Sequence, residues 1–149
     1  MLAKRQIGKA GELLVQYRLL LQGIESSAMT TDAGIDLVAY APNRKRALTI
    51  QVKTNLKPKP GGGKGALALD WWVPCDTPAQ LCALADLEGE RIWLLRKAEV
   101  ARIAQQTSSG RWHLYIYTGT PTRAKAWATL TEMERYLLEH RLEKVLGVS

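Results

Sequence analysis

Residues 48–54 read LTIQVKT, and apolar and polar side chains alternate along the whole stretch. Because successive side chains of a β-strand point to opposite faces, the apolar residues are expected on one face. Gln51 and Lys53 are then expected side by side on the other face, roughly 6.5–7 Å apart along the strand. A lysine that projects from a core strand normally needs carboxylates, a metal site or water nearby. This strand therefore predicts a polar, chemically useful face beside a hydrophobic core.

A second β-type run precedes this strand at residues 35–41 and ends at Pro42-Asn43. Residues 44–46, Arg-Lys-Arg, read as a basic turn between the two runs. A hairpin is the simplest connection, and it could carry Asp36 to the face that bears Gln51 and Lys53.

A helix is predicted for residues 4–21, because apolar residues recur at helical spacing and Gly23 follows as a stop. Glu12 lies among cations and amides on another face of this helix. Gly8 and Gly11 each cost roughly 1 kcal/mol of helix propensity relative to alanine. A helix that carries such glycines usually needs something to approach its backbone closely.

The segment 56–65, LKPKPGGGKG, combines two prolines, four glycines and three lysines. It is expected to be a mobile basic loop without regular structure. It does not fit a phosphate-binding loop, because Pro58 and Gly65 stand where that pattern requires Gly and Ser or Thr. Residues 26–34 are expected to be rich in turns. Further strands are predicted at 66–74, 91–95 and 112–118, and helices at 97–106 and 130–146. This order of elements indicates an α/β sandwich around one mixed sheet.

Length and composition favour one globular domain over residues 1–149, since the chain is 46% hydrophobic and 23% charged. No apolar run approaches the roughly 20 residues of a membrane span, and the first residues lack a signal peptide's apolar core. A cytoplasmic protein without a membrane partner is expected. Two cysteines and two histidines argue against a disulfide framework, a zinc site or chemistry built on histidine clusters.

Positive charge is concentrated at one end of the chain. Residues 1–66 hold eleven of the 21 basic residues but four of the 14 acidic ones, and the remainder is neutral. A polyanion would be attracted to the first part. Charge alone leaves two readings open, a solvated surface and nucleic-acid binding.

Four residues form a constellation that suits phosphodiester hydrolysis: Glu12, Asp36, Gln51 and Lys53. Hard oxygen ligands bind Mg²⁺, which polarises a phosphate and lowers the pKa of bound water. A fixed ammonium offsets negative charge that builds on the phosphate oxygens. The plainer alternative is that Lys53 forms a structural ion pair with Glu12 or Asp36, while Gln51 bonds to a neighbouring backbone.

The patterns GKAGE at 8–12, GIDLV at 34–38 and IQVKT at 50–54 together resemble the PD-(D/E)xK nuclease superfamily. This superfamily includes archaeal Holliday junction resolvases and small homing endonucleases, and the match covers about the first third of the chain. The resemblance implies a restriction-endonuclease-like sandwich, with a central mixed β-sheet flanked by helices.

The resemblance also implies roles for individual residues. Asp36 matches the metal-binding aspartate and Lys53 the lysine of the motif, while Gln51 stands where an acid is usual. Glu12 resembles a helix acid that some branches use for a second metal. The backbone carbonyl of Val52 would be a further ligand. Ile35 replaces the motif's proline, and the Q-x-K form resembles that of some small homing endonucleases.

The implied function is a homing-type or junction-resolving DNA endonuclease that depends on Mg²⁺, with Mn²⁺ as a substitute. Its DNA would be duplex or branched, with RNA left open, and the enzyme would be a homodimer or homotetramer. The alternative is a non-catalytic nucleic-acid-binding module or subunit whose nuclease site has decayed. The candidate DNA contacts are Arg5, Lys9, Gln16, Lys57, Lys59 and Lys64. Trp71 and Trp72 are either core residues or surfaces on which bases stack.

Overall fold

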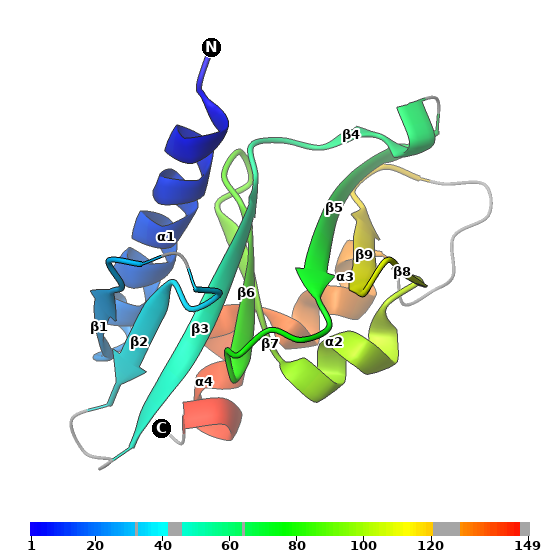
Figure 1. Ribbon diagram of the computed structural model, residues 1–149. Coiled ribbons are helices and arrows are strands. Elements are labelled where there is room, and N and C mark those ends of the chain that lie inside the picture. Colours follow the sequence, from blue (N-terminus) through cyan, green and yellow to red (C-terminus); the bar gives the residue numbers. More distant parts are fainter. Residues whose placement is uncertain (32, 42–45, 64, 121–128, 147–149) are drawn as a thin grey trace.

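The computed structural model describes residues 1–31, 33–41, 46–63, 65–120 and 129–146. The larger of its two sheets has five strands in the order β1-β2-β3-β6-β7 (Figure 1). The pairing of β3 with β6 is parallel and the other pairings are antiparallel, so this is the mixed central sheet that the sequence predicted. Its strands are β1 (Glu25–Ala28), β2 (Leu37–Tyr40), β3 (Ala47–Asn55), β6 (Leu81–Asp86) and β7 (Arg91–Arg96).

The hairpin that was expected to bring Asp36 to the central strand is present. β2 and β3 run antiparallel, with Leu37 opposite Ile50 and Tyr40 opposite Ala47. The basic turn predicted at 44–46 lies outside the described residues except for Arg46.

A second, antiparallel sheet was not predicted. Its strand order is β4-β5-β9-β8, and Figure 1 shows it beside the larger sheet. Side chains from both sheets form one hydrophobic core, in which Leu69 and Trp71 pack with Leu84 and Trp93. Trp71 is thus a core residue. The strands are β4 (Lys59–Pro60), β5 (Leu67–Pro74), β8 (Gln106–Ser108) and β9 (Arg111–Tyr117).

The prediction that 56–65 holds no regular structure was wrong in part. Lys59 and Pro60 form β4 against β5, and Gly61–Gly63 form a single 3-10 turn, η1. The backbone N–H of Gly61 donates to the carbonyl of Ala66, which closes the turn. Gly63 adopts a φ of +83°, which glycine reaches without steric cost.

The helix predicted at 4–21 is confirmed as α1 (Lys4–Leu21), but the two later helices differ. Helix α2 (Lys97–Ile103) stops early, because Ala104 is extended and the chain enters β8. The helix predicted at 130–146 is broken at Leu137, whose extended backbone bridges to Trp93. The pieces are α3 (Leu130–Met133), the 3-10 turn η3 (Glu134–Tyr136) and α4 (Leu138–Leu146).

Strands β1 and β6 escaped prediction for different reasons. Residues 26–34 were expected to be turns, but Glu25–Ala28 form the largely exposed edge strand β1, whose polar residues carry no hydrophobic alternation. Strand β6 is buried along its whole length, so its sequence LCALAD shows no period of two.

The core on the other side of the larger sheet lies under α1 and α4. Val15 and Leu19 of α1 pack there against Leu37 and Ile50. The opposite flank of α1 leaves Leu13, Tyr17 and Leu20 exposed, so the helix carries apolar residues on two faces. Among the described residues, no helix is long and apolar enough to cross a membrane.

Candidate functional site

Asp36 lies one residue before β2, and strand β3 fixes its carboxylate. The backbone N–H of Asp36 donates to the carbonyl of Ile50 at 2.9 Å. Its Oδ2 accepts a 2.7 Å hydrogen bond from the backbone N–H of Val52. The carboxylate thus serves as the acceptor for a strand N–H and is held beside residues 51–53. Hydrogen bonds of an ionised carboxylate to backbone N–H groups are short and strong, which orients the side chain.

Gln51 is an interior amide whose oxygen has no partner. The residue is 6% exposed, and Oε1 makes no hydrogen bond with any of the described residues. A buried amide oxygen without a donor or cation costs about 1–3 kcal/mol. The alternative that the sequence left open was a hydrogen bond between Gln51 and a neighbouring backbone. In the described chain, no backbone N–H donates to Gln51 Oε1. Such an orphaned oxygen is the kind of atom that a bound cation would satisfy.

Lys53 lies two residues further along the same strand and is half-buried. It forms no ion pair with Glu12 or Asp36, and it bonds to no other residue that the structure describes. The structural ion pair considered from the sequence is therefore not the role of this lysine. Its ammonium group is free to bind an anion.

Cys82 of β6 lies opposite Gln51 in the parallel pairing of β3 with β6, so the two side chains are on the same face of the sheet. Burial raises the pKa of the Cys82 thiol to about 11, and the cationic groups of Lys53 and Lys97 oppose that rise without cancelling it. The effect of Lys53 on this thiol indicates that the ammonium lies near the face of β6 that carries Cys82.

Glu12 enters from α1, which runs beside β3 (Figure 1). Its carboxylate is 23% exposed and pairs with Lys9, at 3.3 Å between Nζ and Oε2. The preceding residue, Gly11, is in contact with Thr54 of β3. No hydrogen bond or ion pair joins Glu12 to Asp36, Gln51 or Lys53. The structure thus brings Asp36, Gln51 and Lys53 together through strand β3 and places Glu12 on the helix beside that strand.

The donor set fits a weakly bound divalent cation. Within the described part of the chain, no three His, Cys, Asp or Glu side chains gather closely enough to hold a metal ion. A magnesium site would need amide and backbone oxygens as well, and Mg²⁺ accepts such hard oxygen donors. The Asp36 carboxylate, the orphaned Gln51 oxygen and the Val52 carbonyl, with Glu12 further away, are the candidates.

The candidate DNA contacts are spread over two surfaces. Arg5 and Lys9 are exposed on α1, where Gln16 is half-buried. Lys57 and Lys59 are exposed on the segment that leads into the second sheet, and Lys64 lies outside the described residues.

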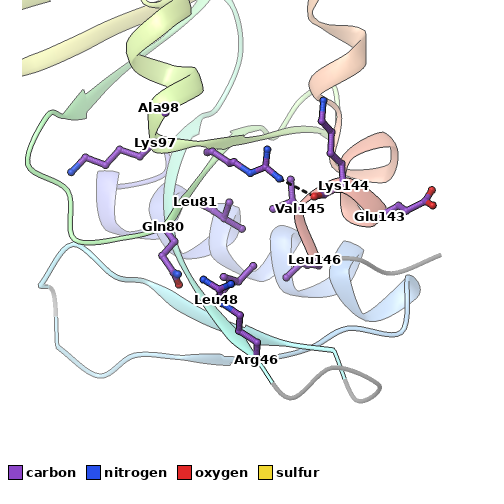
Figure 2. Close-up of a pocket in the computed structure, with 11 residues that line it drawn as sticks. Arg46, Leu48, Gln80, Leu81, Lys97, Ala98, Glu143, Lys144, Val145 and Leu146 are labelled. Carbon is purple, nitrogen blue, oxygen red and sulfur yellow. Dashed lines mark hydrogen bonds between the residues drawn. The ribbon is translucent and has the colours of Figure 1, made fainter.

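A separate basic cavity of about 600 Å³ lies at the other end of β3. Figure 2 shows Leu48, Leu81 and Leu146 in its centre and Lys97 and Glu143 at its margins. None of Glu12, Asp36, Gln51 or Lys53 lines it. Sequence reasoning did not single out this cavity, because its four cations come from three distant segments, with the basic turn ending at Arg46 as the one local signal. They are Arg46, Arg96, Lys97 and Lys144.

The mixed central sheet and its flanking helices define the class: an α/β sandwich of the restriction-endonuclease type, as the sequence predicted. A solved structure that is similar is that of a bacterial homing endonuclease, I-Ssp6803I. The TM-score is 0.67 and the identity 14%, with 99% of this chain and 94% of that chain covered. The structure of Archaeoglobus fulgidus Hjc, a Holliday junction resolvase from an archaeal hyperthermophile, has a TM-score of 0.49 and 14% identity, with coverage of 77% and 91%.

The likeness to the homing endonuclease confirms the predicted resemblance at the level of the fold. No protein-family model matches the chain, and no curated protein matches it. At 14% identity, this similarity shows the fold alone. The chemistry of the site therefore rests on this chain's own residues.

Proposed function

We propose that this chain is a divalent-metal-dependent DNA endonuclease. The observation that carries the proposal is the 2.7 Å hydrogen bond that holds the Asp36 carboxylate beside Gln51 and Lys53. A fixed carboxylate and an orphaned amide oxygen can hold a divalent cation, and an unpaired ammonium can offset the charge that builds on a phosphate during hydrolysis. The nuclease fold of the similar homing endonuclease agrees with this assignment.

Each residue has a role that follows from its surroundings. Asp36 and the Gln51 oxygen would hold the cation, together with the Val52 carbonyl. When bound, Mg²⁺ would polarise the scissile phosphate and acidify a water molecule. Lys53 would hold a phosphate oxygen and offset the charge that develops on it during attack. Glu12 would orient water beside the site, since its carboxylate lies on the adjacent helix.

The substrate is proposed to be DNA because exposed basic residues lie on the two segments that adjoin strand β3. Arg5 and Lys9 lie on the helix that bears Glu12, and Lys57 follows the strand that bears Lys53. Cations placed in this way bind the phosphate backbone without reading its sequence. Binding is therefore expected to weaken steeply as the salt concentration rises.

A symmetric assembly of two or more copies is proposed with this activity. One site cuts one strand, whereas a duplex or a junction offers two strands related by symmetry. The exposed apolar residues Leu13, Tyr17 and Leu20 of α1 offer a surface for a second copy. Analytical ultracentrifugation of the wild type and of Tyr17→Glu tests this: a dimer that Tyr17→Glu dissociates supports it, and a monomeric wild type contradicts it.

The proposed activity is tested by incubating purified protein with supercoiled plasmid and with branched DNA in Mg²⁺. Cleavage should require the metal, stop with EDTA and be lost in Lys53→Ala. Lys144→Ala is the matched control, because it removes the same charge from the separate basic cavity. A Lys53→Ala protein that cuts as fast as the wild type would overturn the assignment of this site.

One observation favours the second candidate, a nucleic-acid-binding module whose nuclease site has decayed. Gln51 stands where an acid is usual in the family that the sequence resembles, and the described residues contain no three-ligand acidic cluster. The variant Gln51→Glu distinguishes a functional nuclease site from a decayed one. Its Mn²⁺ binding is measured by electron paramagnetic resonance and its cleavage of DNA is measured in parallel. A functional site should bind Mn²⁺ more tightly and keep or gain activity. A decayed site should bind DNA without cutting it in either form.

A further inference from the structure

The outer face of the second sheet carries a continuous set of ring and polar side chains. On β9, His113, Tyr115 and Tyr117 alternate with core residues and so share one face. The register on β5 places Trp72 opposite His113 and Asp70 opposite Tyr115. These five side chains point away from the larger sheet, because their neighbours along each strand form the core between the sheets.

The rings of this face are locked against one another. Trp72 stacks on His113 with centroids 4.0 Å apart and an interplanar angle of 6°. The guanidinium of Arg111 lies 5.4 Å from the Trp72 ring centroid. Tyr115 and Tyr117 meet edge to face at 5.3 Å. The Trp72–His113 pair thus forms a rigid base, and the two half-buried tyrosines extend it.

A cavity of about 410 Å³ opens over these tyrosines. This volume lies within the range of small-molecule sites, roughly 300–1,000 Å³. Lys59 and Gln106 line it from the two outer strands, and the Asp70 carboxylate lies 2.9 Å from Nε2 of His113. The cavity therefore combines aromatic faces with one cation, one amide and one carboxylate.

We propose that this face binds unpaired nucleotides, with one base stacked on Tyr115, another on Tyr117 and a phosphate on Lys59. A nucleotide matches the set of groups, because its planar base stacks on aromatic rings while its edge exchanges hydrogen bonds with amides and carboxylates.

The identification of DNA as the source of that nucleotide rests on the proposed function. Lys59 follows β3 by four residues, so the face adjoins the basic segment beside the cleavage site. A strand that separates near the cut would place unpaired bases within reach of it. The stacking chemistry itself is independent of the metal site.

The test compares three fluorescein-labelled ligands in EDTA: a short oligothymidine, an abasic oligomer with the same phosphates, and a duplex of equal length. Fluorescence anisotropy should show oligothymidine binding more tightly than the abasic oligomer. Tyr115→Leu and Tyr117→Leu should each weaken oligothymidine binding by about 5- to 150-fold, the effect of losing one stacked base. Binding of the abasic oligomer should not change.

Controls separate stacking from folding and from catalysis. Tyr115→Phe keeps the ring and should retain binding, and Tyr40→Leu removes an exposed tyrosine from β2 and should have no effect. Oligouridine that binds as well as oligothymidine supports the same stacking chemistry for either nucleic acid. Oligothymidine binding that equals abasic binding, or a Tyr115→Leu protein that binds like Tyr40→Leu, overturns the proposal. Because the binding is measured in EDTA it does not depend on cleavage, so loss of cleavage in Lys53→Ala and loss of stacking in Tyr115→Leu are distinguishable failures.

Discussion

Gly11 of α1 lies so close to Thr54 of β3 that a Cβ on the glycine would meet Thr54 Oγ1 at 1.8 Å. Thr54 could not yield easily, because its own Cβ would be 2.8 Å away. The contact sets how near the helix approaches the strand and hence where Glu12 stands relative to residues 51–53. Only one of the two glycines in the helix has this function, because a Cβ at Gly8 would meet nothing within 4 Å.

Gly11→Ala should therefore destabilise the protein, whereas Gly8→Ala should stabilise it. Overpacking at Gly11 is expected to cost about 1–3 kcal/mol. Removing a glycine from an open helical position should gain up to about 1 kcal/mol. Urea denaturation of both variants measures the difference, and equal stabilities would show that the helix can move away from Thr54 at no cost.

We expect the protein to lose stability at alkaline pH, over a pH range that the pKa of the Cys82 thiol sets. Burial raises the pKa of this thiol from 9.0 to about 11 in the folded protein. Between these values the unfolded chain releases the proton and the folded chain keeps it, so stability falls as the pH rises. The contribution is complete below pH 9 and amounts to roughly 2–3 kcal/mol lost by pH 11.

The control for this prediction is Cys82→Ala, which has no thiol to titrate at that position. Its free energy of unfolding should decline less steeply than that of the wild type between pH 9 and 11. The half-buried Cys75 should react with iodoacetamide in the folded protein, while Cys82 should stay unmodified. If the free energies of unfolding of the wild type and Cys82→Ala declined in parallel with pH, ionisation of the Cys82 thiol would not be the cause of the loss.

Arg141 is a buried cation of α4 that ties three elements together. It pairs with Glu99 of α2, donates to the carbonyl of Leu94 at 3.2 Å and lies over the ring of Tyr136. Arg141→Met would remove the cationic partner of Glu99 and leave it only the hydrogen bond from the backbone N–H of Arg96, at a cost of about 3–5 kcal/mol. The exposed Lys144→Met on the same helix should change stability by no more than about 0.5 kcal/mol. Thermal unfolding of both compares them, and similar midpoints would mean that Arg141 is dispensable.

The elements that hold the candidate site were predictable because their patterns are local. Alternation along β3 and helical spacing along α1 follow from one buried face each, and the hairpin follows from the short connection. The pattern failed where both faces are buried, as in β6, and where a long-range contact overrides helix propensity, as at Leu137. It also failed for the second sheet, since nothing local distinguishes strands that pair in one sheet from strands that pair in two.

The candidate site could likewise be predicted from the sequence only in part. Strand alternation placed Gln51 and Lys53 on one face, and the hairpin brought Asp36 near them. The bond from Val52 to Asp36 and the orphaned oxygen of Gln51 depend on side-chain geometry that the sequence does not contain. The ring face on β9 was missed as well, because its Trp72–His113 stack depends on the β5 register.

Asp36 allows the structural and chemical roles of one carboxylate to be separated. Asp36→Ala would leave the Val52 N–H without its acceptor and should cost about 1–3 kcal/mol of stability. Asp36→Asn keeps a side-chain oxygen for that N–H, so it should be nearly as stable as the wild type, yet it lacks the charge that holds the cation. Urea denaturation should rank Ala below Asn, while electron paramagnetic resonance should show weak Mn²⁺ binding in both. If Asp36→Asn binds Mn²⁺ as well as the wild type does, the carboxylate is a structural group and the metal site lies elsewhere.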